Sequence, residues 1–219
     1  LRDALPSLNV IAENLSDLDS ELLKETAEEL PLPEELYQLL CASLKKEPST
    51  FIRDGNVIAG NYAICEYLEE FNREIPLLPQ DLKQRAEVRR LVEWFAHKYY
   101  KEDYRNIANE KIHKRFGSGL APDSRILKIC LNNLNFHLEY LDWLTERNNY
   151  LAGENLTLAD AAAAAQLSII DYLGDVPWEG YRNAKLWYSK MKSRPSFKDI
   201  LKDSVKGILP AKHYANLDF

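Results

Sequence analysis

The sequence predicts a chain in two parts, a mixed α/β N-terminal part over residues 1–76 and an all-helical bundle over residues 77–219. In the first part, short apolar runs flank Asp54-Gly55, which is the usual signal of a β-hairpin. In the second part, apolar residues recur almost throughout at the three- and four-residue spacing of helices. Between them, residues 72–81 contain Pro76 and Pro79 and predict an interdomain linker.

Composition limits the classes of function. The 219 residues carry a net charge of −6, which argues against a nucleic-acid partner, because such a partner needs a basic face. No segment has the pattern of a membrane span or a secretory signal, so we expect no membrane insertion. Cys41, Cys65 and Cys130 lie far apart without a CxxC pattern, which predicts reduced thiols in a cytoplasmic protein and no structural metal.

The elements of the first part follow from breakers and periodicity. Residues 2–8 are expected to end a helix, residues 9–13 to form a short strand, and residues 18–46 to be helical with a break at Pro31–Pro33. A hairpin is expected over residues 47–60. Residues 63–71 have apolar side chains on one face and glutamates opposite, which predicts an amphipathic helix.

The second part begins with a helix expected over residues 82–109, followed by an irregular turn over residues 111–124. Asp123 or Ser124 is expected to cap the next helix. Its leucines suit either a coiled coil or the core of a bundle, and the short run favours the bundle. These leucines are Leu127, Leu131, Leu134, Leu138, Leu141 and Leu144.

The stretch 151–170 contains the strongest helix start. Thr157 is a good N-cap, and Asp160 can bond back to the cap's own N–H group, so the two residues predict a capping box. The five alanines and the apolar residues that follow cover every face, so we expect a helix surrounded by protein. A structural cap fully explains Thr157 and Asp160, and no catalytic role is assigned to them.

Two motifs carry a resemblance. Residues 151–162, Leu-Ala-Gly-Glu-Asn-Leu-Thr-Leu-Ala-Asp-Ala-Ala, resemble the central-helix motif of the glutathione transferase superfamily. The run Trp-Tyr-x-x-Met-x-x-Arg-Pro-Ser-Phe at residues 187–197 resembles the family's last-helix signature. The resemblance implies the glutathione S-transferase (GST) fold, with a thioredoxin-like α/β N-terminal domain and an all-helical C-terminal domain.

The same resemblance implies a glutathione site. Pro48 aligns with the family's cis-proline, where the backbone of the preceding residue, Glu47, would pair with the cysteinyl part of glutathione. Gly60 and Asn61 stand where the family has the Glu-Ser turn that holds the γ-glutamyl carboxylate. Both differ from the family's residues, so Asn61 is expected either to cap the helix alone or to serve as a ligand. Glutathione is thus a cofactor that the resemblance raises without establishing.

Family members begin with a strand and a loop carrying a catalytic Tyr, Ser or Cys. The first residues here resemble the end of the helix that follows that loop, so we expect the first strand and the loop to be missing from this sequence. No catalytic residue is therefore assigned. Cys65 is interpreted as a packing residue, and the histidines at positions 97, 113 and 137 as structural residues. The tyrosines at 99, 100 and 104 suit a substrate pocket, a dimer contact or simple packing.

The C-terminal tail, residues 207–219, cannot form a regular helix beyond Pro210. With residues 64–70, it resembles the alphaproteobacterial glutathione-transferase-like division proteins that bind the tubulin-like protein FtsZ and end in His-Tyr-x-x-Leu-Asp-Phe. Tyr214, Leu217 and Phe219 would be the anchors of a docking peptide, flanked by His213 and Asp218. The alternative is that the tail packs on its own domain, and the two are compatible.

These observations lead to two functional hypotheses. The first is a cytoplasmic homodimer of GST fold that is non-catalytic and binds FtsZ filaments in bacterial cell division. The second is a glutathione S-transferase that conjugates glutathione to small electrophiles, which would require a donor that lowers the pKa of the thiol.

Overall fold

The computed structural model describes residues 50–53, 56–71, 76–205 and 207–217. The helical segments and the strand expected over residues 2–46 therefore lie outside the described residues. The same is true of Cys41, Glu47 and Pro48. Asp218 and Phe219 lie outside them as well.

The first described elements are a hairpin and a helix. Strands β1 (Thr50–Arg53) and β2 (Asn56–Ala59) pair antiparallel, with Thr50 opposite Ala59, as the Asp-Gly signal predicts. Gly60 has a positive φ of 95°, a conformation that glycine adopts readily, and it turns the chain into α4 (Asn61–Phe71). The amphipathic pattern of α4 is confirmed, because Ile64, Cys65 and Leu68 are buried.

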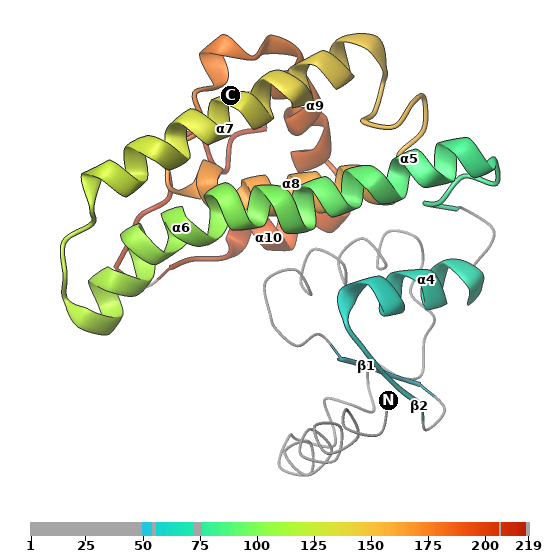
Figure 1. Cartoon of the computed structure of the whole chain (residues 1–219), viewed down its shortest axis with the longest axis horizontal. Coiled ribbons are helices and arrows are strands. Elements are labelled where there is room, and N and C mark those ends of the chain that lie inside the picture. Colours follow the sequence, from blue (N-terminus) through green and yellow to red (C-terminus); the bar gives the residue numbers. More distant parts are fainter. Residues whose placement is uncertain (1–49, 54–55, 72–75, 206, 218–219) are drawn as a thin grey trace.

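A continuous helical run forms the long green rod of Figure 1. Asp81 caps it by accepting hydrogen bonds from the N–H groups of Lys83 and Gln84, at 3.1 and 2.9 Å. The run consists of α5 (Leu82–Glu93), the π-helical η1 (Trp94–Tyr104), α6 (Arg105–Ala108) and the π-helical η2 (Asn109–Ser118).

The irregular turn predicted from residue 111 is wrong, because η2 keeps the chain helical to Ser118. The helix ends only where Gly119 adopts a left-handed φ of 66° and donates its N–H to the carbonyl of Lys114. Gly117 lies within η2 and does not end the helix.

Helix α7 (Ser124–Arg147) begins after Asp123, which accepts a 2.8 Å hydrogen bond from the N–H of Arg125. The helix packs against η1, α6 and α9. Leu134, Leu138, Leu141 and Leu144 are buried there, so this part of the leucine stripe belongs to a bundle core, as expected. Leu127 is half-buried and Leu131 is exposed, so the start of the stripe lies outside the core.

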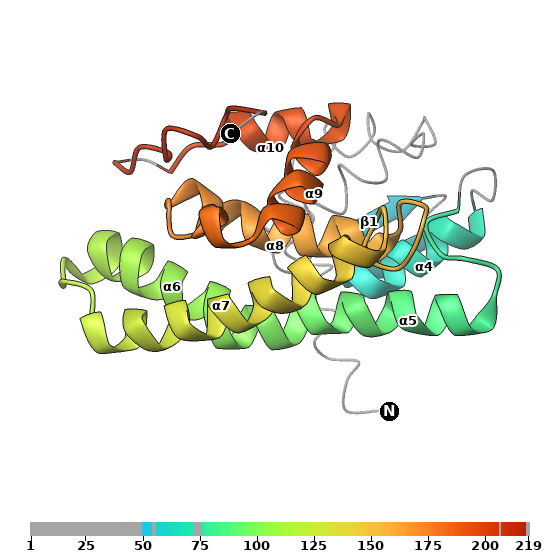
Figure 2. The same ribbon diagram turned by 90° about the horizontal axis from the view of Figure 1, so that it is seen from above.

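Helix α8 (Leu158–Tyr172) is the centre of the helical bundle. Figure 2 shows it between the layer of α5, α6 and α7 and the layer of α9 (Arg182–Lys192) and α10 (Lys198–Lys202). Two short 3₁₀ turns, η3 (Trp178–Gly180) and η4 (Pro195–Phe197), connect this second layer. All residues of α8 except Ile169 are buried, and its alanines leave room for neighbouring helices to pack close.

The start of α8 is held by one buried carboxylate. Asp160 accepts hydrogen bonds from the N–H and hydroxyl of Thr157, at 2.9 and 3.0 Å, which forms the capping box. It also accepts from the N–H of Leu151 and from the indole of Trp187, both at 2.9 Å. This one side chain therefore ties together the preceding loop, α8 and α9.

No helix in the described part of the chain is long and apolar enough to cross a bilayer.

Candidate functional site

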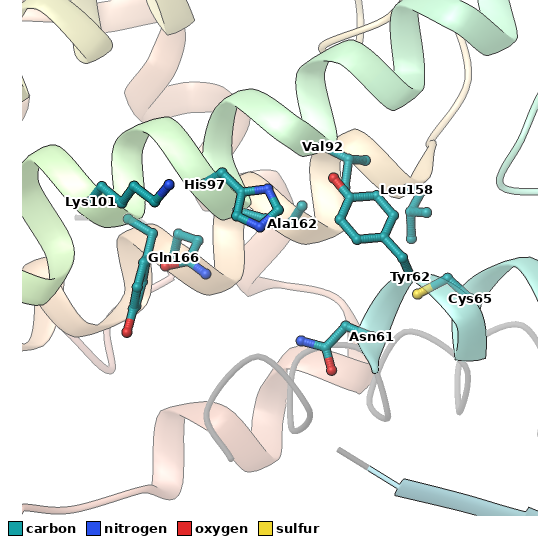
Figure 3. Close-up of a pocket in the computed structure, with 11 residues that line it drawn as sticks. Asn61, Tyr62, Cys65, Val92, His97, Lys101, Leu158, Ala162 and Gln166 are labelled. Atoms are coloured by element: carbon teal, nitrogen blue, oxygen red, sulfur yellow. The ribbon is translucent and has the colours of Figure 1, made fainter. Parts of the chain in front are cut away.

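A cavity of about 270 Å³ lies between α4 and the helices α5, η1 and α8 (Figure 3). Each of these elements contributes one wall, so the cavity forms only when α4 packs beside the helical bundle. It is lined by Asn61, Tyr62, Cys65, Val92, Ala96, His97, Tyr100, Lys101, Leu158, Ala162 and Gln166.

Polar contacts connect α4 to α5 and η1 at this cavity. The hydroxyl of Tyr62 donates to Oε2 of Glu93 at 3.3 Å, and Nδ1 of His97 lies 2.6 Å from the same oxygen. The rings of Tyr62 and His97 stack, with centroids 6.2 Å apart. Burial and the nearby Glu93 carboxylate raise the pKa of Tyr62 above its ordinary value, so its hydroxyl stays protonated.

Two amide oxygens at the cavity have no hydrogen-bond partner in the described part of the chain. They are Oδ1 of Asn61 and Oε1 of Gln166, both inaccessible to solvent. The prediction that Asn61 caps α4 is therefore wrong, because a capping oxygen must accept a backbone N–H. Buried polar groups are normally paired, so these acceptors would suit a bound molecule that carries N–H or O–H donors.

Cys65 lines the cavity but is a poor nucleophile. Burial, aided by the Glu66 carboxylate, raises the pKa of its thiol to about 12. Since the thiolate is the reactive form, this environment disfavours covalent chemistry at Cys65. The packing interpretation is consistent with its burial, and Cys130 is buried as well.

Only two of the four expected glutathione-site residues lie within the described part of the chain. Gly60 and Asn61 are placed at the start of α4, beside the cavity, whereas Glu47 and Pro48 lie outside the described residues. Glutathione binding stays a prediction.

The tyrosine cluster of η1 is divided among three surroundings. Tyr99 is fully buried in the core. Tyr100 lines the cavity beside α4, and Tyr104 lines a second cavity of about 270 Å³ near the C-terminal end of α8. The pocket and packing interpretations therefore each apply to a different tyrosine.

His137 has a structural position, as predicted. Its Nδ1 accepts a 3.1 Å hydrogen bond from the indole of Trp94, and its Nε2 lies 3.0 Å from Oε2 of Glu102. Beside it, Asp103 is completely buried, and neither of its carboxylate oxygens has a hydrogen-bond partner among the described residues. Burial and the charge of Glu102 raise the pKa of Asp103 to about 7. The described residues contain no group of three His, Cys, Asp or Glu placed to hold a metal ion.

The C-terminal tail folds back on the helical bundle. Tyr214 is only 2% exposed, and His213 bonds to the buried Asp171. Leu217 is 38% exposed and faces solvent. The alternative of packing on its own domain therefore holds for His213 and Tyr214, and the protein-binding role of the tail stays a prediction.

Three residues of these sites were not singled out from the sequence. Gln166 is a polar residue within an apolar helical run, and that interruption was the available signal. Asp171 and Lys192 are both completely buried and lie 3.6 Å apart. Since they are 21 positions apart in different helices, no local pattern links them.

Comparisons with known proteins agree with this architecture. Residues 125–195 match the family model described as glutathione S-transferase, C-terminal domain. Over 163 residues the chain is 47% identical to FtsZ-localized protein A of Caulobacter vibrioides, covering 74% of this chain and 72% of that protein.

Solved structures lead to the same family. A structure described as FzlA from C. crescentus has a TM-score of 0.74 and 44% identity, with 78% of this chain and 76% of that chain covered. A glutathione S-transferase from Rhodospirillum rubrum F11 also has a TM-score of 0.74, with 39% identity over 84% of this chain and 94% of that one. The chain is thus similar both to glutathione S-transferases and to an FtsZ-localized protein.

Proposed function

This chain belongs to the glutathione S-transferase superfamily, and within it to the family of FtsZ-localized protein A, and on that premise we propose that it is a non-catalytic, protein-binding factor of bacterial cell division that binds FtsZ filaments. Because such filaments would be its partner, we propose a cytoplasmic location. The cavity beside α4 would then be a remnant of the fold.

The observation that carries this proposal is the tail. It follows the last helix of a GST-fold chain and ends in His-Tyr-Ala-Asn-Leu-Asp-Phe, while the relative that shares this family is named for its localisation with FtsZ. Leu217 is exposed at the end of the described tail, where an apolar side chain is available to a partner.

The test is co-sedimentation of the full chain with purified FtsZ filaments. We expect removal of residues 210–219 to abolish binding, and Leu217→Asp to weaken it about tenfold or more, because a charge would replace an apolar anchor. Leu186→Asp on α9 is a matched control, because Leu186 is also an exposed leucine, away from the tail. Binding that survives both tail variants would refute the proposal.

We further propose that the protein is a homodimer that associates through α7. Ile129, Phe136 and Trp143 lie seven residues apart on this helix, which places them on one face, and they are 61%, 53% and 50% exposed. Large apolar side chains in such a row favour an interface, and a helix face of this kind suits a second copy of itself.

Sedimentation velocity of the full chain tests the dimer. We expect Phe136→Ser with Trp143→Ser to produce a monomer, whereas Leu186→Ser should leave the sedimentation coefficient unchanged. A dimer that persists in the double variant would place the interface elsewhere.

A glutathione transferase activity is the second candidate, favoured by the cavity and its two unpaired amide oxygens. The γ-glutamyl ammonium and the amide N–H groups of glutathione are donors that such acceptors could bind. Calorimetric titration with glutathione tests this candidate. Heat of binding that is lost in Gln166→Leu would support a ligand site, and no heat with clear FtsZ co-sedimentation would favour the scaffold role.

A further inference from the structure

The tail is attached to the helical bundle by its own side chains. Tyr214 lies inside, with its ring in a T-shaped contact with Tyr172 at 5.1 Å between centroids. Its hydroxyl donates to the carbonyl of Ile200 at 3.1 Å, so the hydroxyl of Ser168, 2.9 Å away, is the donor to Tyr214. One aromatic side chain thus contacts α8 and α10 at once.

His213, the residue before Tyr214, bonds to both members of the buried Asp171–Lys192 ion pair. Nε2 of His213 lies 2.8 Å from Oδ1 of Asp171, which also accepts a 2.7 Å hydrogen bond from the indole of Trp178. The ammonium of Lys192 lies 3.6 Å from the other Asp171 oxygen and donates to the backbone carbonyl of His213 at 3.2 Å. Since Asp171 and Lys192 are both completely buried, the tail supplies polar partners that water cannot replace without opening the site.

Backbone contacts hold the same segment. The N–H of Ala211 donates to the carbonyl of Tyr172 at 2.8 Å. The N–H of Tyr214 then bonds to the carbonyl of Ala211 at 2.9 Å, and that of Asn216 to the carbonyl of His213 at 3.0 Å. The tail is therefore two successive turns and not an extended strand.

This geometry gives the tail an inner and an outer face. His213 and Tyr214 point into the bundle, whereas Lys212, Ala215, Asn216 and Leu217 are exposed. Figure 2 shows the tail running over the α10 side of the bundle, away from α5. The outer residues are thus presented together at one site on a folded surface.

We propose, building on the proposed function, that the tail binds its filament partner as a preformed anchored turn whose outer face makes the contact, and that Asp171, Lys192 and Ser168 are positioning residues for this binding. His213 and Tyr214 are then anchors to the protein's own bundle and do not enter the partner. A segment already held in its bound shape loses less conformational entropy on association than a free peptide does. The partner contact is expected at Lys212, Ala215, Asn216 and Leu217.

The first experiment compares the full chain with a synthetic peptide of residues 207–219 in FtsZ-filament binding. We expect the peptide to bind about tenfold more weakly or worse, because it lacks the bundle that holds the turn. Equal affinity of the peptide and the full chain would overturn the proposal, since the tail would then act as a flexible ligand.

The second experiment uses variants that leave the outer face intact. Asp171→Asn and Tyr214→Phe should each lower filament affinity toward that of the peptide, and both should speed digestion of the tail by carboxypeptidase. Asp175→Asn, which removes the Lys111 ion pair four residues further on, and Ser193→Ala serve as controls that keep the tail contacts. Tyr214→Phe keeps the ring in place, so it remains informative if Asp171→Asn fails to fold.

The outcomes separate this proposal from the function on which it rests. If removal of residues 210–219 abolishes binding while Tyr214→Phe and Asp171→Asn bind as the unaltered chain does, the anchored turn is refuted and the filament-binding function stands. If removal of the tail leaves binding unchanged, both are refuted.

Discussion

The two halves of α8 meet different surroundings. In the first half, Leu158, Ala162 and Gln166 face the cavity beside α4, where the Oε1 atom of Gln166 has no hydrogen-bond partner in the described part of the chain. In the second half, Ser168 and Asp171 both bond to side chains of the tail. One half of α8 therefore has a buried polar group without a hydrogen-bond partner among the described residues. In the other half, the polar side chains form hydrogen bonds to the tail.

This difference separates two kinds of site. Unsatisfied buried acceptors cost free energy in the absence of a ligand, so the cavity is the place where a small molecule would add stability. In the tail region, the hydroxyls of Ser168 and Tyr214 and Oδ1 of Asp171 are hydrogen-bonded within the chain. Oδ2 of Asp171 has no hydrogen-bond partner among the described residues, but the Lys192 ammonium lies 3.6 Å from it. Four substitutions test how far this contrast extends, beginning with the one expected to have the largest effect.

Asp160→Ala should break the helix on which both regions depend. It removes the acceptor of the Leu151 and Thr157 N–H groups and of the Trp187 indole, all buried, so we expect a loss of about 3 to 5 kcal/mol in the free energy of unfolding. Urea denaturation followed by circular dichroism measures it. Asp160→Asn retains one acceptor oxygen but places an NH2 group against two donors, so it should also destabilise the chain, by less than alanine does. Unchanged stability in both variants would contradict the anchoring role of these hydrogen bonds.

Asp103→Asn tests a buried carboxyl without hydrogen bonds, the opposite of Asp160. Its pKa is about 7 in the folded chain against an ordinary 3.8, so between these values the folded state holds a proton that the unfolded state releases. Stability from this group therefore falls as pH rises from about 4 to 7. We expect the asparagine variant to be about 2 kcal/mol more stable at pH 8 and nearly equal at pH 4.

The measurement for Asp103 is a series of thermal or urea unfolding curves across this pH range for both chains. Glu102→Gln is a companion variant, because the Glu102 charge is the second cause of the raised pKa. A stability difference that does not change with pH would contradict the buried, proton-holding state of Asp103.

Ser168→Ala removes one hydrogen bond to the tail. The Tyr214 hydroxyl keeps its bond to the Ile200 carbonyl, so we expect a loss of only about 1 kcal/mol. Hydrogen exchange at the Ala211 and Tyr214 N–H groups should increase more than exchange within α9, where Ser193→Ala provides the control. Uniform exchange throughout the bundle would argue against a local attachment.

Gln166→Leu removes a polar group that has no hydrogen-bond partner among the described residues, whereas Ser168→Ala removes one that has a partner. Replacing an unpaired buried amide by an apolar side chain should leave stability unchanged or raise it by about 1 kcal/mol. Thermal unfolding of the two chains decides the sign. A clear destabilisation would indicate that the Gln166 amide already has a partner in the ligand-free protein, which would weaken the contrast between the two halves of α8.

Much of the fold followed from patterns within a few residues. The hairpin around residues 54–55, the amphipathic α4 and the cap of α7 at Asp123 are interactions between near neighbours, so residue types at short spacing are enough to predict them. The capping box is of the same kind, because Thr157 and Asp160 are three positions apart. The helical extension to Ser118 was missed because glycine tolerates several conformations, and its effect depends on the φ that it adopts.

The sites depended on contacts between distant segments. The sequence left Tyr214 as either an anchor for a partner or a residue packed on its own domain. Its hydroxyl is bonded inside the bundle by Ser168, 46 positions earlier, and by Ile200. The sequence left Asn61 as either a cap or a ligand. In the structure its oxygen has no hydrogen-bond partner in the described part of the chain, and the residue lines a cavity between α4, α5, η1 and α8. Local chemistry thus settled which elements form and where most of them begin, because helix caps and turns are short-range. Which polar groups are paired, buried or left open was settled by packing, because each partner comes from another part of the chain.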